Sequence, residues 1–229
     1  MREPLKDFIF SSNNDCPWIF LILIFFRMKR IVVLISGNGS NLQAVIEAVA
    51  SGNIKAKIEL VVSNRATAYG LERAKKHGIP TFTKLLKTYK ESGRTRIEYD
   101  VDLATDIKSL LGAEPDLQIL AGFMHILSAQ YVNSFPPGSI INLHPALPGC
   151  FEGANAIPRS LSAFKNGEIT NTGVMVHCVI PEVDMGAPIV VREIEIFQND
   201  TLADLENRIH LVEHEIIVEG IIIALGRME

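Results

Sequence analysis

Short runs of apolar, often β-branched residues alternate with longer amphipathic stretches from Ile31 onward. The first run, Ile31–Ile35, has the length and composition of a buried strand. Gly37–Asn41 follows as a glycine-rich turn, and Leu42–Ala50 carries apolar residues at helical spacing. This opening pattern predicts a strand, a loop and a helix, the unit from which parallel α/β sheets are built.

The same alternation continues through the middle of the chain. The sequence after Lys76 contains Gly78, suited to a left-handed helix cap, and Pro80, which cannot continue a helix. Strands are predicted at Ile58–Val62, Leu117–Ala121 and Ile140–Leu143, and helices at Tyr69–Lys76, Ile97–Leu111 and Ser128–Ser134.

The last third of the chain has a different pattern. A helix near Arg159–Lys165 precedes two extended segments, Gly173–Val179 and Ile189–Ile196, which are close enough in sequence to pair antiparallel. Thr201 and Asp204 resemble a capping pair that opens a helix reaching about Leu225. The predicted fold is a Rossmann-like, mostly parallel sheet flanked by helices, with an antiparallel portion toward the C-terminus.

Residues 1–27 do not share this pattern. Trp18–Phe26 is a run of nine apolar residues, too short to span a bilayer, and no small-residue cleavage site follows it. We expect residues 1–27 to be an extension outside the fold, or the product of an incorrectly assigned start, and residues 28–229 to form one domain.

Composition narrows the possible partners. A net charge of −4 and a pI near 5.9 give no electrostatic case for nucleic acid as a partner, and no membrane partner is expected. Cys16, Cys150 and Cys178 are widely spaced, without the pattern of a zinc site, and are typical of reduced thiols in a cytoplasmic protein. The sequence therefore favours small-molecule ligands and no metal.

The turn at Gly37–Asn41 lies where backbone N–H groups at a helix start favour a phosphate or carboxylate. It departs from the dinucleotide-binding pattern, because Leu42 occupies the third glycine position and Ser63 and Asn64 end the next strand without an acidic residue. A monophosphate is the favoured ligand, and tight strand-to-helix packing is the alternative explanation.

Asn142 and His144 are two residues apart on a predicted strand, so both side chains face the same side at its carboxyl end. An amide donor beside an imidazole suits a tetrahedral intermediate of acyl transfer. Asp184 follows another extended segment, and a carboxylate near His144 would raise the imidazole pKa above about 6.5. Taken singly, a His-Pro turn with Asn142 capping a loop is the alternative for the pair, and a turn carboxylate is the favoured explanation of Asp184.

Five segments of the chain carry a resemblance to a known family: IVVLISGNGSNLQA (31–44), AGFMHIL (121–127), INLHPALPG (141–149), VHCV (176–179) and EVD (182–184). Together they resemble the phosphoribosylglycinamide formyltransferase family. Glu213 and His214 in the closing helix complete the series, and the loop ALPGCF at residues 146–151 is similar to the fungal form.

The resemblance implies transfer of a formyl group from 10-formyltetrahydrofolate to the amine of glycinamide ribonucleotide, a step of purine synthesis that needs no metal. It assigns the ribonucleotide phosphate to Gly39, Ser40 and Asn41, and the glycinamide end to Glu213. It also implies that Asn142 and His144 stabilise the formyl oxyanion, while Asp184 keeps His144 charged or relays protons.

For the folate, the resemblance points to two loops as the walls of a slot for the pterin ring. His125 stands where bacterial members commonly carry Arg, and residues 151–158 lack a His often present there. The expected folate-binding residues are Arg96, Met124, His125, Ile126, Leu127, Asn142, Ile180, Pro181, Glu182, Val183 and Asp184.

Two other functions would use parts of the same pattern. A formyltetrahydrofolate hydrolase of the same superfamily would bind the same cofactor but usually carries an N-terminal regulatory domain. A noncatalytic nucleotide-binding module would explain the glycine-rich loop but would leave Asn142, His144 and Asp184 unexplained.

Overall fold

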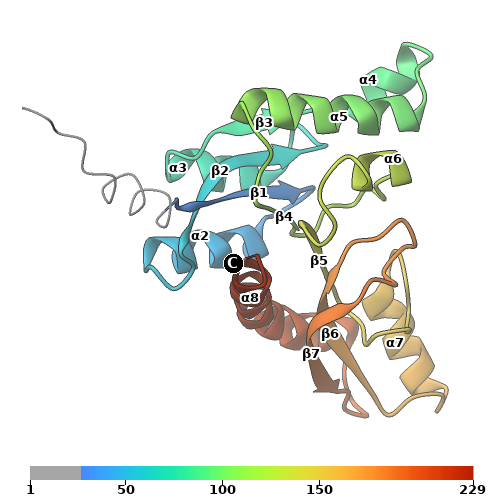
Figure 1. The fold of residues 1–229 in the computed structure, drawn as a ribbon. Helices are drawn as coiled ribbons and strands as arrows, with labels where there is room; N and C mark the ends of the chain where they lie inside the picture. Colours follow the sequence, from blue (N-terminus) through green and yellow to red (C-terminus); the bar gives the residue numbers. More distant parts are fainter. Residues whose placement is uncertain (1–26, 229) are drawn as a thin grey trace, which may run out of the picture.

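The computed structural model describes residues 27–228, which form one seven-stranded sheet in the order β3-β2-β1-β4-β5-β6-β7 (Figure 1). Strands β1 to β5 run parallel, and β6 pairs antiparallel with both β5 and β7. The predicted fold class, including its antiparallel C-terminal portion, is confirmed. The strands are β1 Lys29–Ile35, β2 Ala56–Ser63, β3 Thr81–Thr83, β4 Leu117–Leu120, β5 Ile140–His144, β6 Asn171–Cys178 and β7 Pro188–Glu195.

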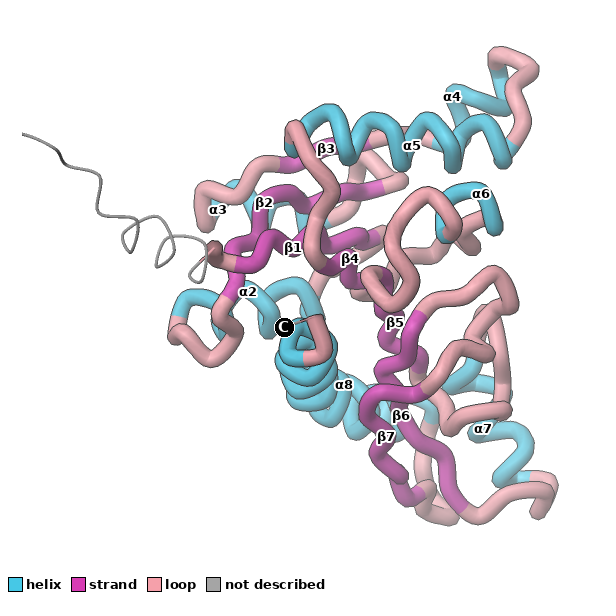
Figure 2. The backbone as a smooth tube through the Cα atoms, in the orientation of Figure 1, coloured by secondary structure: helices cyan, strands magenta, loops and turns pink. Residues whose placement is uncertain are grey.

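Helices cover both faces of this sheet, as Figure 2 shows for the cyan helices around the magenta strands. Helices α2 and α8 pack on one face, and α5 with α6 packs on the other. The helices are α2 Ser40–Ala50, α3 Tyr69–Lys76, α4 Leu86–Glu91, α5 Arg96–Leu111, α6 Ala129–Val132, α7 Ala156–Lys165 and α8 Leu202–Gly226.

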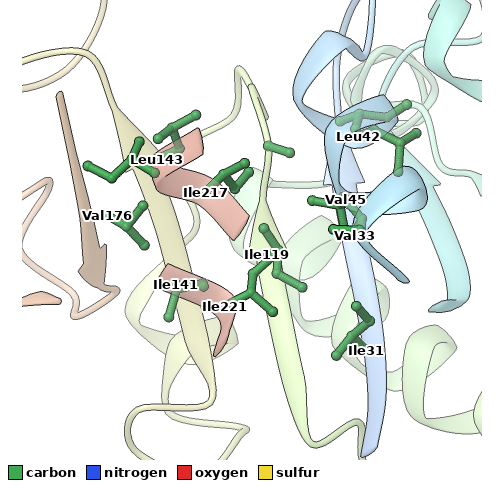
Figure 3. Close-up of a cluster of buried hydrophobic side chains, with 14 of the residues drawn as sticks. Ile31, Val33, Leu42, Val45, Ile119, Ile141, Leu143, Val176, Ile217 and Ile221 are labelled. Atoms are coloured by element: carbon green, nitrogen blue, oxygen red, sulfur yellow. The ribbon is translucent and has the colours of Figure 1, made fainter. Parts of the chain in front are cut away.

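Strand β1 supplies side chains to both hydrophobic cores. Ile31 and Val33 point toward α2 and α8, where Figure 3 shows them with Leu42 and Ile217. Val32 and Leu34 of β1 pack instead against α5. Because successive side chains of a strand point to opposite faces, a central strand covered on both sides must be apolar at nearly every position. This requirement explains the continuous apolar run from which the strand was predicted.

The long closing helix α8 begins with the predicted cap. The Thr201 hydroxyl oxygen accepts a hydrogen bond from the Asp204 N–H at 3.3 Å, and the Asp204 carboxylate accepts one from the Thr201 N–H at 2.9 Å. This reciprocal pairing satisfies two N–H groups that the helix itself leaves unbonded. The helix then crosses the sheet beside β6 and β7, which places Glu213 at its middle.

Two elements, β3 and α4, were not predicted. Strand β3 has three residues, and α4 has six residues of which none is buried, so neither carries a hydrophobic period. Helix α4 is fixed to α5 through Tyr89, whose hydroxyl donates to Asp102 at 2.7 Å and whose ring meets Tyr99 edge-on. The expected extension at residues 1–27 lies outside the described residues, apart from Arg27.

The chain direction across the sheet reverses between β1 and β4. From β1 the chain proceeds outward to β2 and β3, and it then returns to the other side of β1 to form β4 and β5. The loops that leave β1 and β4 therefore diverge at their carboxyl ends and open a crevice, which is the usual ligand site of open α/β sheets.

Gly220 allows α8 to approach β6 closely. A Cβ atom added at Gly220 would lie 2.6 Å from Val176 Cγ1 and 2.8 Å from its Cβ, whereas at Gly226, in the same helix, it would meet no described atom within 4 Å. We predict that Gly220→Ala lowers the free energy of unfolding by about 1 to 3 kcal/mol. Gly226→Ala, the matched control, should change it by less than about 1 kcal/mol and in the stabilising direction. Urea unfolding of both variants measures the difference, and equal effects would contradict the close approach.

Candidate active site

Asp184 lies in the loop between β6 and β7 with a left-handed backbone, at φ 55°. Aspartate tolerates this conformation better than most residues, although it remains strained. The loop also needs Gly186, because a Cβ atom there would lie 1.7 Å from the Cys178 carbonyl oxygen. The close packing of the loop against the end of β6 fixes where the Asp184 carboxylate points.

The Asp184 carboxylate contacts four groups from three other segments. The Asn142 amide donates to its Oδ1 at 3.1 Å, and the Gly153 N–H donates to its Oδ2 at 2.8 Å. His144 Nδ1 lies 3.4 Å from Oδ2, and His177 Nε2 lies 3.4 Å from Oδ1. The structure therefore brings together the three residues expected to be catalytic, Asn142, His144 and Asp184.

His177 is a member of this cluster to which the sequence assigned no role. It lies directly opposite Asn142 in the antiparallel pairing of β5 and β6, with its Nε2 3.2 Å from the Asn142 amide nitrogen. His177 Nδ1 faces the Cys178 carbonyl oxygen at 2.9 Å. Only the register between β5 and β6 would have identified it, and the sequence does not specify that register.

The pKa of Asp184 lies below its ordinary value. Burial disfavours the charged carboxylate, but His177, the Gly153 N–H and the nearby imidazole of His144 together outweigh that effect. Asp184 is therefore a carboxylate at neutral pH and can stabilise positive charge that develops on a neighbouring histidine.

The pKa of His144 is lowered, opposite to the direction predicted from the sequence. Burial is the largest cause, and together with the nearby His177 it outweighs the opposing effects of Asp184 and of the backbone at Phe151 and Cys150. The expectation that Asp184 keeps His144 charged is thus wrong for the unliganded protein. Nδ1 of the neutral imidazole faces Asp184, while Nε2 is buried without a hydrogen-bond partner among residues 27–228. His144 is consequently arranged to accept a proton at Nε2.

A mainly apolar cavity of about 310 Å³ opens beside these groups. Two of the residues expected to bind folate, Arg96 and Glu182, are not among the described residues that line it. Arg96 is the exposed first residue of α5, and the side chain of Glu182 is exposed on the loop before Asp184. The expected residues that do line the cavity are Met124, His125, Ile126, Leu127, Asn142, Ile180, Pro181, Val183 and Asp184.

A second cavity, of about 290 Å³, lies at the start of α2 and includes the loop Ser36–Asn41 in its wall. Gly39 precedes α2 with φ 76° and has no side chain that could cap the helix. The first N–H groups of α2 therefore have no capping hydrogen bond. Gly39 also requires hydrogen in place of a side chain, since a Cβ atom would lie 2.7 Å from Gly70 Cα. The helix start is thus suited to an anion. Arg65, which no sequence motif indicated, adds a positive charge to the cavity wall.

Glu213 reaches the second cavity from α8. Its side chain is buried, 6% exposed, and accepts a hydrogen bond from the Asn41 amide at 3.1 Å. Burial raises the pKa of Glu213 despite the opposing effects of Asn41 and His210. A buried carboxylate in a cavity wall is suited to bind a ligand amine, rather than to solvate a helix face.

The two cavities are adjacent because they share part of their wall. Gly122, Met124, Leu143 and Pro145 line both of them. A ligand in each cavity would have one end near these shared residues, close to Asn142 and His144. The arrangement is therefore suited to transfer a small group from one bound molecule to another.

No three His, Cys, Asp or Glu side chains within residues 27–228 are grouped so that they could hold a metal ion. No helix of this part is both long and apolar enough to cross a membrane.

Comparison with known proteins agrees with this geometry. The sequence pattern of the formyl transferase family matches residues 29–221. A phosphoribosylglycinamide formyltransferase of Schizosaccharomyces pombe is 49% identical over 85% of this chain and 96% of its own length, and one of Dictyostelium discoideum is 47% identical over 84% and 96%. The crystal structure of glycinamide ribonucleotide transformylase 1 from Symbiobacterium toebii superposes with a TM-score of 0.78 at 35% identity, covering 87% of this chain and 89% of that one. The chain therefore belongs to the formyl transferase family, and its resemblance to the phosphoribosylglycinamide formyltransferases extends over most of its length.

Proposed function

We propose that this chain transfers the formyl group of 10-formyltetrahydrofolate to the amine of glycinamide ribonucleotide, in purine biosynthesis. The observation that carries the proposal is the pair of adjoining cavities, one holding Asn142, His144 and Asp184 and the other an anion-binding helix start with the buried Glu213. The names of the similar proteins support the same reaction. The free thiols of Cys150 and Cys178 are in keeping with a cytoplasmic location.

The chemistry of each cavity decides which ligand it takes. The second cavity takes the ribonucleotide, with its phosphate at Gly39, Ser40 and Asn41 and its amine near Glu213. The apolar first cavity takes the flat pterin ring of the folate, with the formyl group toward Asn142. The amine and the formyl carbon then meet at the shared wall.

The transfer needs a proton acceptor and a stabiliser of negative charge. As the amine attacks the formyl carbon, a C–N bond forms and the carbonyl electron pair moves to oxygen. His144 Nε2 accepts the proton that the amine loses, and Asp184 stabilises the resulting imidazolium. The Asn142 amide is held by Asp184, and its other N–H, which faces His177 Nε2 in the unliganded protein, would turn to the oxyanion. His144 then returns the proton to N10 of the folate as the C–N10 bond breaks.

The pH dependence follows from the neutral state of His144. Protonation below its pKa removes the proton acceptor, and burial holds that pKa below the ordinary value of about 6.5. We predict that kcat/KM stays level above about pH 6.5 and falls toward tenfold per unit on the acid side. Steady-state rates from pH 5 to 8 test this, and a kcat/KM that instead falls as the pH rises through this range would show that His144 works in its charged form.

Removing the charge of Asp184 tests its role toward His144. Asp184→Asn keeps the shape of the side chain but no longer stabilises the imidazolium, so kcat should fall by about 100-fold or more. The matched control is Asp106→Asn, which alters a carboxylate on α5 that is paired with Lys84. This variant should leave kcat unchanged. Thermal unfolding of both variants shows whether the fold survives, and full activity of a folded Asp184→Asn would remove Asp184 from the mechanism.

The anion site makes a separate prediction. Asn41→Asp places a second carboxylate beside Glu213 and adds a negative charge where the phosphate binds. KM for the ribonucleotide should rise by about tenfold or more, equivalent to at least about 1.4 kcal/mol, while KM for the folate stays within about twofold. Equal weakening of both substrates would contradict the assignment of the second cavity.

A formyl-transfer assay with and without glycinamide ribonucleotide tests the function itself. The proposal expects formylated ribonucleotide in the complete mixture and little consumption of 10-formyltetrahydrofolate without the acceptor. Rapid formate release without the acceptor would instead indicate a hydrolase. Binding of the ribonucleotide without any turnover would indicate a noncatalytic module.

A further inference from the structure

The loop Gly122–Leu127, which contributes to the wall of the folate cavity, has side chains that alternate between the cavity rim and the protein interior. Met124 and Ile126 are 67% and 49% exposed, whereas Phe123, His125 and Leu127 are buried. Because the rim side chains are largely exposed, they make few packing contacts that would hold the loop in place. Its position depends on the inward side chains and on polar contacts.

Two hydrogen bonds to Ser36 fix the loop from the side of β1. The Met124 N–H donates to the Ser36 hydroxyl oxygen at 2.7 Å, and that hydroxyl donates to the Asn64 side chain, also at 2.7 Å. The Ser36 N–H donates to the Gly122 carbonyl oxygen at 3.1 Å. The first half of the loop is thereby tied to the strand end that carries the ribonucleotide site.

A second contact fixes the loop from α5. Asp100 is fully buried, with its Oδ1 2.5 Å from His125 Nε2, while its Oδ2 accepts a hydrogen bond from the Ser128 N–H at 2.8 Å. The rings of Tyr99 and Phe123 meet the His125 imidazole edge-on, at 5.3 and 5.9 Å between centroids. The side chain of His125 therefore points away from the cavity, toward α5.

We propose that Asp100 is a positioning residue for the folate co-substrate, acting through His125 and the Ser128 N–H on the loop that forms the cavity wall. Asp100 contacts the loop on both sides of Leu127, so it fixes the spacing of the backbone groups that face the cavity. A buried carboxylate bonded to one ring nitrogen and one N–H holds both in a single geometry. This inference rests on the proposed function in one respect, that the first cavity takes the folate.

The inference explains why His125 matters without touching the ligand through its imidazole. The side chain was expected to hold the cofactor, but the structure gives it a partner in the interior instead. Its contribution is then to loop geometry, and any donor that reaches Asp100 should replace it. Loss of either partner should weaken folate binding and leave the ribonucleotide cavity unaffected.

The test is the affinity for tetrahydrofolate, measured by titration calorimetry, together with KM for both substrates. Asp100→Asn should raise the tetrahydrofolate Kd and the KM for 10-formyltetrahydrofolate by about tenfold, with KM for the ribonucleotide and kcat within about twofold. Asp200→Asn is the matched control, because Asp200 is also buried and bonded, but its partners Phe197 and Arg208 line neither cavity. It should leave the tetrahydrofolate Kd unchanged.

A second pair of variants separates positioning from folding. His125→Gln retains a donor toward Asp100 and should bind tetrahydrofolate within about threefold of the wild type, whereas His125→Leu should match Asp100→Asn. A merely structural role would lower the melting temperature without changing Kd in the folded fraction. A folded Asp100→Asn with wild-type Kd overturns the inference. If Asp100→Asn does not fold, equal binding of tetrahydrofolate by His125→Gln and His125→Leu overturns it instead. Failure of the wild type itself to bind tetrahydrofolate would instead overturn the proposed function.

Discussion

The carboxylate of Asp184 joins parts of the active site that come from separate segments of the chain. Asn142 and His144 belong to β5, His177 belongs to β6, and Gly153 lies in the loop before α7. Burying a carboxylate is costly unless its oxygens are bonded, and here both oxygens are. The contacts that hold the charge are the same contacts that place the amide and imidazole, so charge and geometry depend on each other.

The fold provides this arrangement through two features of one sheet. The antiparallel β6 sets His177 beside Asn142 and brings the Asp184 loop back over the end of β5. The reversal of chain direction across the sheet between β1 and β4 opens the second cavity. Helix α8, which packs on the same face of the sheet as α2, supplies Glu213 to its wall. Because the two cavities share part of their wall, each ligand can be recognised by its own chemistry while their reacting ends meet near His144.

Local sequence signals predicted much of this architecture. Hydrophobic periodicity and capping patterns involve only a few neighbouring residues. They were enough to predict the apolar strands, the cap at Thr201 and the common face of Asn142 and His144. His177 and Asp100 were missed because their roles depend on contacts between distant segments. The direction of the His144 pKa depends on how deeply the ring is buried, which no local pattern specifies. Arg96 lies outside the cavity wall because it is the exposed first residue of α5, whose start is set by the Thr95 cap.

The central claim is that Asp184 holds a neutral His144 with its proton on Nδ1, leaving Nε2 free to accept another. Nitrogen-15 NMR of the histidine rings, titrated in the wild type and in Asp184→Asn, measures this directly. The account predicts a wild-type His144 that is neutral at pH 7.5, protonated at Nδ1 and titrating below about 6.5, with a still lower midpoint in the variant. A doubly protonated His144 at pH 7.5, or a midpoint that Asp184→Asn leaves unchanged, would contradict it.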